Sequence, residues 1–302
     1  MIITHIVPMS NSLATPILGA KLHHMRQLYT LHTHTIGFDG RNSVQEMVDT
    51  ARTNGFKTIG ISNHFIVHPT IKQSPMYPYS VRGGYSNIYS SDFDEVMARF
   101  VPHYQELENL RTTNSDIQIL RGMEVDFFPN MHWQKNFEKC LNILRPDYII
   151  GSCHFIEYNN SLLNSHDWQR ADADTQDILL KNYWNNVANA ARSGLFTWMA
   201  HLDLPKKVNM GRENKWQDYE NYAVESIATY CGATEINTGL YRPDCYEPYP
   251  STRILQMIKN NNVAVLVSDD AHAVNQIGRH FADAEKLIHD LNLRKFEIMK
   301  QR

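Results

Sequence analysis

The sequence predicts an α/β fold in which seven parallel strands alternate with helices and close into a (β/α)7 TIM-like barrel. Two observations predict it. Short apolar segments recur along the chain, and each is followed by a loop and an amphipathic helical segment. A crossover of that length returns the chain to the same edge of a sheet, so the strands run parallel. Each apolar segment also ends in a histidine or an acidic residue, at the rim where such barrels carry their chemistry.

Length and composition favour one large domain. The 302 residues are 42% hydrophobic, which is enough for one barrel core. We expect a barrel domain over residues 25–302, preceded by an N-terminal extension over residues 1–24 whose structure the pattern does not predict. A net charge of −3, with scattered lysines and arginines, disfavours a nucleic acid or an anionic membrane as partner. Four widely spaced cysteines and no secretory leader are typical of reduced thiols, so we expect a cytoplasmic protein with a small-molecule substrate.

The first predicted strand, residues 28–34, ends in His32 and His34. Residues two apart on a strand share a face, so both imidazoles can bind one metal ion, with Asp39 arriving from the turn that follows. Taken alone, such a pair is more often two solvated imidazoles. The metal interpretation therefore depends on further ligands elsewhere in the chain.

The second predicted strand, residues 57–64, ends in His64. It is followed by a long loop, residues 65–91, that is rich in Pro, Tyr, Ser and Gly. Loops of this length are usually functional. Because this one starts at the mouth of the barrel, we expect it to cover the substrate.

The clearest helices are predicted from apolar stripes and end signals. In the first of them, Ser43 and Glu46 form a capping box. Pro102 is expected to kink or split another, because proline lacks an amide proton and clashes with the preceding turn. These helices lie at about residues 43–55, 92–111, 133–144, 175–193 and 216–231.

The remaining strands are predicted at residues 117–124, 147–154, 196–201, 233–237 and 263–268. They deliver, in this order, Glu124, His154, His201, Glu235 and the segment from Asp269 to His272. One such residue is more often a hydrogen-bonded rim side chain or an ion-pair partner. Seven strands that all end this way are hard to explain as a purely structural rim. The other histidines lie outside strand ends, and we interpret most of them as solvated or helical-surface residues: His5, His23, His24, His68, His103, His132, His166, His280 and His289.

Five blocks of the chain carry a resemblance to a known family. They are Leu31 to His34 with Asp39 and Gly40, Gly122 to Asp126, Gly151 to Phe155, His201 to Leu204, and Ser268 to His272. In this order they resemble the polymerase and histidinol phosphatase (PHP) superfamily. A further block, Glu235 to Arg242 followed by Tyr249 to Ser251, is similar to its monofunctional histidinol-phosphatase branch. The resemblance runs from about Tyr29 to Leu291.

The resemblance implies a distorted seven-stranded barrel that holds three divalent metal ions at the carboxyl ends of its strands. It assigns one ion to His32, His34, Glu124 and Asp270, a second to Glu124, His154 and His201, and a third to Asp39, His64 and His272. A carboxylate shared by two cations reduces their mutual repulsion. Mixed imidazole and carboxylate ligation suits Zn²⁺, Mn²⁺ or Fe.

Two positions depart from the family pattern. Asn63 precedes His64 where the family usually has an acidic residue, so a carboxylate that would orient this histidine is missing. Asp269 adds an acidic residue beside Asp270, and either of the two can be the ligand.

The activity implied by the resemblance is hydrolysis of L-histidinol phosphate to L-histidinol and phosphate, in histidine biosynthesis. Asp270 and His272 are the candidates to protonate the leaving alkoxide. Arg242 is the first choice for binding the substrate phosphate and Arg279 the second, because a guanidinium matches two oxygens at once. For both arginines a surface ion pair is the alternative. The tyrosines of the long loop can stack on the substrate imidazole, or simply dock on the barrel: Tyr77, Tyr79, Tyr85 and Tyr89.

Two other functions are open at this point. One is a phosphatase or phosphodiesterase of the same kind that acts on another small phosphate ester. The other is a metal-holding barrel used for binding or regulation, which would be expected to have lost ligands. None of the nine implied ligands is missing from the sequence.

Overall fold

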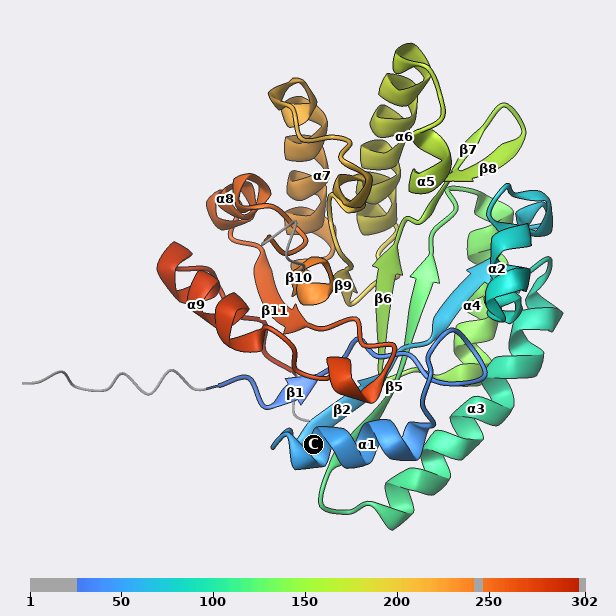
Figure 1. Cartoon of the computed structure of the whole chain (residues 1–302), viewed down its shortest axis with the longest axis vertical. Coiled ribbons are helices and arrows are strands. Elements are labelled where there is room, and N and C mark those ends of the chain that lie inside the picture. Colours follow the sequence, from blue (N-terminus) through green and yellow to red (C-terminus); the bar gives the residue numbers. More distant parts are fainter. Residues whose placement is uncertain (1–25, 242–246, 299–302) are drawn as a thin grey trace, which may run out of the picture.

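The computed structural model describes residues 26–241 and 247–298, and it shows a parallel sheet nearly closed into a barrel (Figure 1). The barrel strands are, in spatial order, β1 (Tyr29–Thr30), β2 (Thr58–Ile61), β5 (Gln118–Asp126), β6 (Tyr148–Ser152), β9 (Trp198–Met199), β10 (Ala233–Asn237) and β11 (Ala264–Ser268). All neighbours on this path pair in parallel. A parallel bridge between Thr33 and Ala271 brings the two ends of the path together. The predicted barrel is confirmed; the predicted extension over residues 1–24 lies outside the described residues.

Helices surround the sheet (Figure 1). They are α1 (Val44–Thr53), α3 (Phe93–Thr113), α4 (Met131–Leu144), α6 (Ala173–Arg192), α7 (Gln217–Tyr230), α8 (Thr252–Asn260) and α9 (Phe281–Leu291). The capping box of Ser43 and Glu46 starts α1. Of the two effects expected of Pro102, the split is wrong, since α3 runs through it, and the kink stays a prediction. Pro102 is exposed, so water can replace the lost hydrogen bond. Among the described residues, no helix has the length and apolar character needed to cross a bilayer.

Residues 65–91 are not the irregular loop that their composition predicts. They contain most of β3 (His64–Val67), then α2 (Tyr77–Gly83) and β4 (Tyr89–Ser90), with single 3-10 turns at Ile71–Gln73 and Ser86–Ile88. The buried apolar run that begins at Phe65 explains the extra strand, because β3 pairs with both β4 and β5. We call residues 65–91 the β3–β4 insert. It forms one wall of the barrel mouth (Figure 1).

The second strand also ends earlier than predicted. Strand β2 stops at Ile61, and His64 begins β3 rather than ending β2. In β3, His64 pairs in register with Glu124 of β5. This register places an imidazole beside a buried carboxylate at the centre of the rim.

A second addition follows His154. Strands β7 (Phe155–Tyr158) and β8 (Ser161–Asn164) form an antiparallel hairpin that leads into α5 (Ser165–Trp168). The hairpin and α5 stand on the rim beside the insert (Figure 1), and Glu157 of β7 lies 3.0 Å from His68 of the insert. A 3-10 segment over Leu204–Val208 completes this side of the mouth and contacts α5.

The barrel interior below the rim is filled by aliphatic side chains around two stacked aromatic rings, Tyr148 and Trp198. Tyr148 donates a hydrogen bond from its hydroxyl to the carbonyl of Leu31 (2.6 Å), and its ring stacks on Trp198 at 4.9 Å. A Cβ at Gly60 or Gly122 would come within 2.1 and 2.2 Å of Tyr148, so only glycine leaves room for this ring.

The last described segment closes the interior from the opposite end. We call residues 294–298 the C-terminal plug. Phe296 donates its amide to the carbonyl of Val265 (2.8 Å), and its ring lies 5.8 Å from that of Trp198. The barrel is therefore a packed core with its polar rim at one end only.

Candidate metal centre

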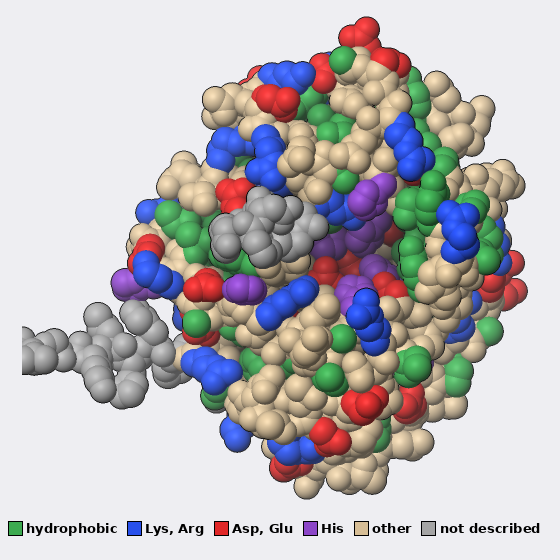
Figure 2. Space-filling model, viewed as in Figure 1, with side chains coloured by type: hydrophobic (Ala, Val, Ile, Leu, Met, Phe, Trp, Pro, Cys, Tyr) green, Lys and Arg blue, Asp and Glu red, His purple; other side chains and the backbone are tan. Residues whose placement is uncertain are grey.

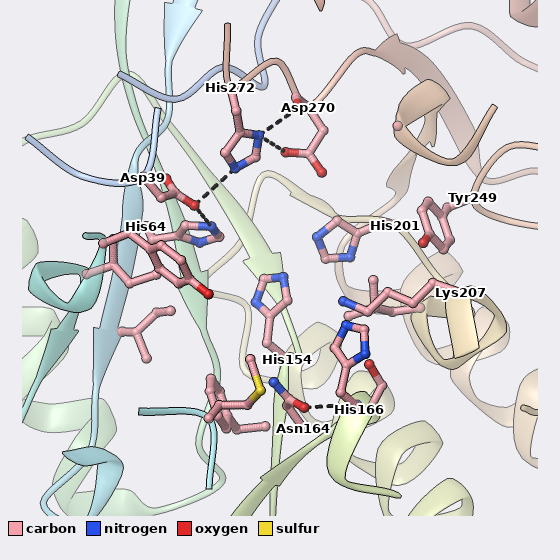
Figure 3. Close-up of a pocket in the computed structure, with 18 of the residues that line it drawn as sticks. Asp39, His64, His154, Asn164, His166, His201, Lys207, Tyr249, Asp270 and His272 are labelled. Atoms are coloured by element: carbon pink, nitrogen blue, oxygen red, sulfur yellow. Dashed lines mark hydrogen bonds and ion pairs between the residues drawn. The ribbon is translucent and has the colours of Figure 1, made fainter. Parts of the chain in front are cut away.

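All nine predicted ligands meet at the carboxyl ends of the strands. They are His32 and His34 after β1, Asp39 in the next turn, His64 at the start of β3, Glu124 in β5, His154 after β6, His201 after β9, and Asp270 and His272 after β11. Figure 3 shows six of them around one cavity, with Asp39 facing both His64 and His272. His32 and His34 are fully buried and Glu124 is 1% exposed, although all three are polar.

The first implied set of ligands is compact. His32 Nε2 lies 3.3 Å from Glu124 Oε2 and 3.5 Å from Asp270 Oδ1. His34 Nε2 lies 3.6 and 3.2 Å from the same two oxygens. Separations of this size between donor atoms match ligands that surround one ion at about 2 Å from each.

Glu124 also faces a second set through its other oxygen. Its Oε1 lies 2.8 Å from His201 Nε2 and 3.5 Å from His154 Nε2. Oε1 thus faces His201 and His154, whereas Oε2 faces His32, His34 and also His64, whose Nδ1 lies 2.9 Å from it. This is the arrangement expected of a carboxylate that bridges two metal ions.

The third set lies on the outer side of the rim. Asp39 Oδ2 is 3.1 Å from His64 Nε2 and 3.0 Å from His272 Nε2. The other ring nitrogen of His272 donates to the carbonyl of Asp270 (2.9 Å), which directs Nε2 toward Asp39.

Several buried polar atoms of this cluster have no hydrogen-bond partner among the described residues. They are His32 Nε2, His34 Nδ1 and Nε2, His64 Nδ1, Asp39 Oδ1 and Glu124 Oε2. Each buried polar atom without a partner costs about 1–3 kcal/mol, so such atoms are rare and need an explanation. Imidazole nitrogens and carboxylate oxygens aimed at common points fit divalent cations in chemical type and in spacing.

The electrostatics of the cluster agree with this fit. Burial lowers the pKa of His32, but the carboxylates of Glu235, Asp270 and Glu124 outweigh it and raise that pKa well above its usual value. Burial raises the pKa of Glu124, but His64, His32 and His154 hold it well below its usual value. The acidic groups therefore favour positive charge on His32, and a bound cation would supply that charge in place of a proton.

Two carboxylates outside the nine hold the imidazoles in place. Glu235 lies 3.0 Å from His32 Nδ1, and Asp126 lies 3.0 Å from His154 Nδ1. In both pairs the second ring nitrogen, Nε2, is left facing the cluster. The sequence interpretation placed Glu235 at a strand end but assigned neither residue the role of orienting a histidine. Strand spacing could have found Asp126, which lies two residues beyond Glu124 and therefore on the same face of β5.

The structure separates the two neighbouring aspartates. The Asp269 carboxylate is turned away from the rim, where it accepts hydrogen bonds from Thr30 Oγ1 (3.0 Å) and the Gly278 amide (2.6 Å). Burial raises the pKa of Asp269 to about 6. Asp270, with a φ of +49°, turns its side chain toward His34 instead. Of the two, Asp270 is placed among the candidate ligands.

Asn63 does not contact the ring of His64 in any described interaction. Its side chain accepts from the Thr35 amide (2.8 Å) and contacts His103 Nε2 (3.1 Å). His64 is oriented by Asp39 and Glu124 instead. His103 is buried on the inner side of α3, so the expectation that it is solvated is wrong.

A cavity of about 410 Å³ lies above the cluster. Figure 2 shows this hollow with histidine and acidic side chains at its floor. The insert lines it with Ile66, Met76, Tyr85, Ile88 and Tyr89. Strand β8, α5 and the 3-10 segment line it with Asn164, Ser165, His166 and Lys207. His166 and Lys207 were missed by sequence reasoning because no strand ends at them (Figure 3).

Some of the predicted phosphate-binding arginines and loop tyrosines line the cavity, and others do not or lie outside the described residues. Arg279 lines the cavity and donates from Nη2 to the carbonyl of Asp269 (2.8 Å). Arg242 lies outside the described residues. Tyr77 and Tyr79 are not among the cavity residues, and Tyr79 is 42% exposed.

Comparison with known proteins agrees with this geometry. A family model described as PHP domain matches residues 29–239. The chain belongs to the PHP family. The resemblance stated from the five sequence blocks is therefore confirmed.

Relatives of this PHP protein have related names. A "Probable histidinol-phosphatase" of Deinococcus radiodurans is 30% identical over 202 residues, which are 65% of this chain and 73% of that protein. The "Histidinol-phosphatase" of Saccharomyces cerevisiae is 23% identical over 302 residues, covering 87% and 89% of the two chains. A crystal structure of histidinol phosphate phosphatase from Lactococcus lactis, solved with zinc, L-histidinol and phosphate, shares the fold. Its TM-score is 0.65 at 16% identity, over 91% of this chain and 98% of that one.

Proposed function

We propose that this PHP protein is a metal-dependent phosphatase that hydrolyses L-histidinol phosphate to L-histidinol and phosphate, a step of histidine biosynthesis. The observation that carries the phosphatase proposal is Glu124, whose two oxygens face separate sets of imidazoles under an open cavity. The substrate is supported by the names of the relatives and by the ligands of the Lactococcus lactis structure.

The proposed cofactors are three divalent ions, Zn²⁺, Mn²⁺ or Fe. The first would be held by His32, His34, Glu124 and Asp270, the second by Glu124, His154 and His201, and the third by Asp39, His64 and His272. When bound, such ions lower the pKa of water toward about 7 and neutralise phosphoryl oxygens.

The residues of the rim supply orientation and proton transfer. Glu235 and Asp126 fix His32 and His154 so that Nε2 of each faces inward. Of the two candidates for delivering a proton to the leaving alkoxide, Asp270 is the better placed, acting through a water. Burial raises the pKa of Asp270, but His32 and His34 hold it well below its usual value, so its carboxylate would orient a proton donor rather than be one. Both ring nitrogens of His272 are engaged, one by the Asp270 carbonyl and one by Asp39. Asp270 lines the cavity with a carboxylate that is 23% exposed.

Phosphate release tests the proposed substrate. Purified protein is supplied with L-histidinol phosphate and a panel of other phosphomonoesters, and inorganic phosphate is measured with and without prior chelation. We expect kcat/KM to be highest for L-histidinol phosphate and turnover to depend on metal. A higher kcat/KM for another ester would identify that ester as the substrate and would leave the assignment as a phosphatase unchanged. No phosphate release from any ester, with metal restored, would reject the phosphatase.

Arg242 remains our proposal for the residue that holds the substrate phosphate. Replacing it by Met is expected to lower kcat/KM by on the order of 10², as loss of a charge-assisted contact of roughly 3 kcal/mol requires. Arg242→Lys should recover part of the loss, because lysine keeps the charge without the fork. Metal content, measured by elemental analysis, should not change. Wild-type kinetics in Arg242→Met would move the role to Arg279, which lines the cavity.

A further inference from the structure

A second cavity adjoins the one above the metal centre. Its volume is about 450 Å³, and it is lined by the turn that carries Asp39 and by the end of α2. Three residues line both cavities: Asp39, Tyr85 and His272. Asp39 and His272 belong to the floor. The boundary above the floor is therefore formed by Tyr85.

The chain is built to hold the Tyr85 ring at this boundary. Gly83 ends α2, and Gly84, with a φ of +77°, reverses the chain so that the Tyr85 amide donates to the carbonyl of Ser80 (3.0 Å). The ring then folds back over Gly83. A Cβ at Gly83 would come within 2.3 Å of Cε1 of Tyr85, so the ring can occupy this place only beside a glycine.

The insert is also fastened to the floor on either side of this ring. The side chain of Asn87 donates to the carbonyl of Gly37, two residues before Asp39. On the other side, Tyr89 packs edge-on against Phe155 at 5.8 Å. Tyr85 therefore lies at a fixed height above the metal centre.

We propose that the ring of Tyr85 limits the size of the leaving group that the enzyme accepts. This rests on the proposed function, which places a phosphomonoester on the floor. A leaving group that extends from the floor enters the cavity of about 410 Å³, and the ring separates it from the cavity of about 450 Å³. A compact leaving group fits on one side of the ring. A wide one collides with the ring, and removing the ring joins the two spaces.

The test compares two esters that differ in width, phenyl phosphate and 1-naphthyl phosphate. In Tyr85→Ala the ratio of kcat/KM for the naphthyl ester to that for the phenyl ester is expected to rise about tenfold, the scale of discrimination that small misfits cause in a pocket. Tyr85→Phe keeps the ring and should keep the ratio. The matched control is Tyr79→Ala on α2, the helix that precedes Tyr85, since Tyr79 is 42% exposed and lines neither cavity.

A second variant moves the ring without removing it. Gly83→Ala places a methyl group where the ring lies, and Gly83 has a helical conformation that alanine adopts freely. The displaced ring should change the naphthyl to phenyl ratio, whereas Tyr79→Ala does not. An unchanged ratio in both Tyr85→Ala and Gly83→Ala would overturn the proposal and leave Tyr85 as a cover only.

Binding separates this proposal from the proposed function. The dissociation constants of phenylphosphonate and 1-naphthylphosphonate, which resist hydrolysis, are measured by calorimetry on metal-loaded wild type and Tyr85→Ala. A relative gain for the naphthyl compound in the variant supports the role of Tyr85, even for an enzyme that does not turn over L-histidinol phosphate. Equal changes for both compounds would contradict it, even for an enzyme that does.

Discussion

Glu124→Gln is expected to reduce kcat for L-histidinol phosphate by more than the roughly 10- to 100-fold that loss of a residue behind a metal ligand costs. Glutamine has nearly the same shape, so packing around β5 is preserved. It has no negative charge, however, and one of its two terminal atoms is an amide nitrogen that cannot bind a cation. Because Oε1 and Oε2 of Glu124 face different sets of imidazoles, one substitution weakens two of the proposed ion sites.

The measurement combines steady-state kinetics, elemental analysis and thermal unfolding. Glu138→Gln is the matched control, since Glu138 is an exposed glutamate on α4 away from the rim and should behave as wild type. Glu124→Gln should retain the circular dichroism of the wild type and contain less metal. Near-normal kcat in this variant at trace metal would show that Glu124 is not a ligand.

Removal of metal is expected to abolish phosphate release completely and to lower Tm by on the order of 10 °C. The first effect follows because the predicted catalytic residues include no serine or cysteine that could attack the phosphorus atom in place of water. The second follows because a ligand that binds only the folded state at about 1,000 times its Kd adds roughly 4 kcal/mol, and each kilocalorie moves Tm by a few degrees. Without cations, the buried donor atoms of the rim also lose their partners.

The experiment uses protein purified without chelator, then treated with a chelator, then supplied with Zn²⁺, Mn²⁺ or Fe²⁺ separately. Elemental analysis of the untreated protein should give about three equivalents of transition metal per chain, one for each of the three proposed ligand sets. Activity and Tm should return together on adding the right ion. Less than one equivalent in the untreated protein, with full activity, would contradict a metal centre.

The parts of the fold that could be predicted are those with a local cause. Capping by Ser43 and Glu46 and the apolar strands set the order of the barrel elements, and strand ends placed His32 and Glu124 on one rim. Helix ends were predicted within a few residues for the same reason. Their signals depend on neighbours in the sequence, which composition and spacing reveal.

The parts that could not be predicted depend on contacts between distant segments. The insert reads as a loop by composition, but pairing of β3 with β5 makes part of it a strand. The sequence pattern predicts that His103 is an exposed helical residue. In the structure its ring contacts the side chain of Asn63, which lies 40 residues earlier in the chain. The role of Asp269 depends on Thr30 and Gly278, which no spacing rule connects to it. Local patterns carry no information about such pairings.

The C-terminal plug limits the access of water to the metal centre from the closed end of the barrel. Trp198, against which Phe296 packs, donates from its indole nitrogen to Glu235 (3.3 Å), and Glu235 in turn holds His32. A column of side chains thus separates solvent at the closed end of the barrel from the carboxylate that orients a proposed ligand. Trimming the chain before Arg294 would open that end, and water entering beside Trp198 would raise the local dielectric constant around Glu235. A truncation at the closed end of the barrel would then lower the affinity of the rim for metal at the other end.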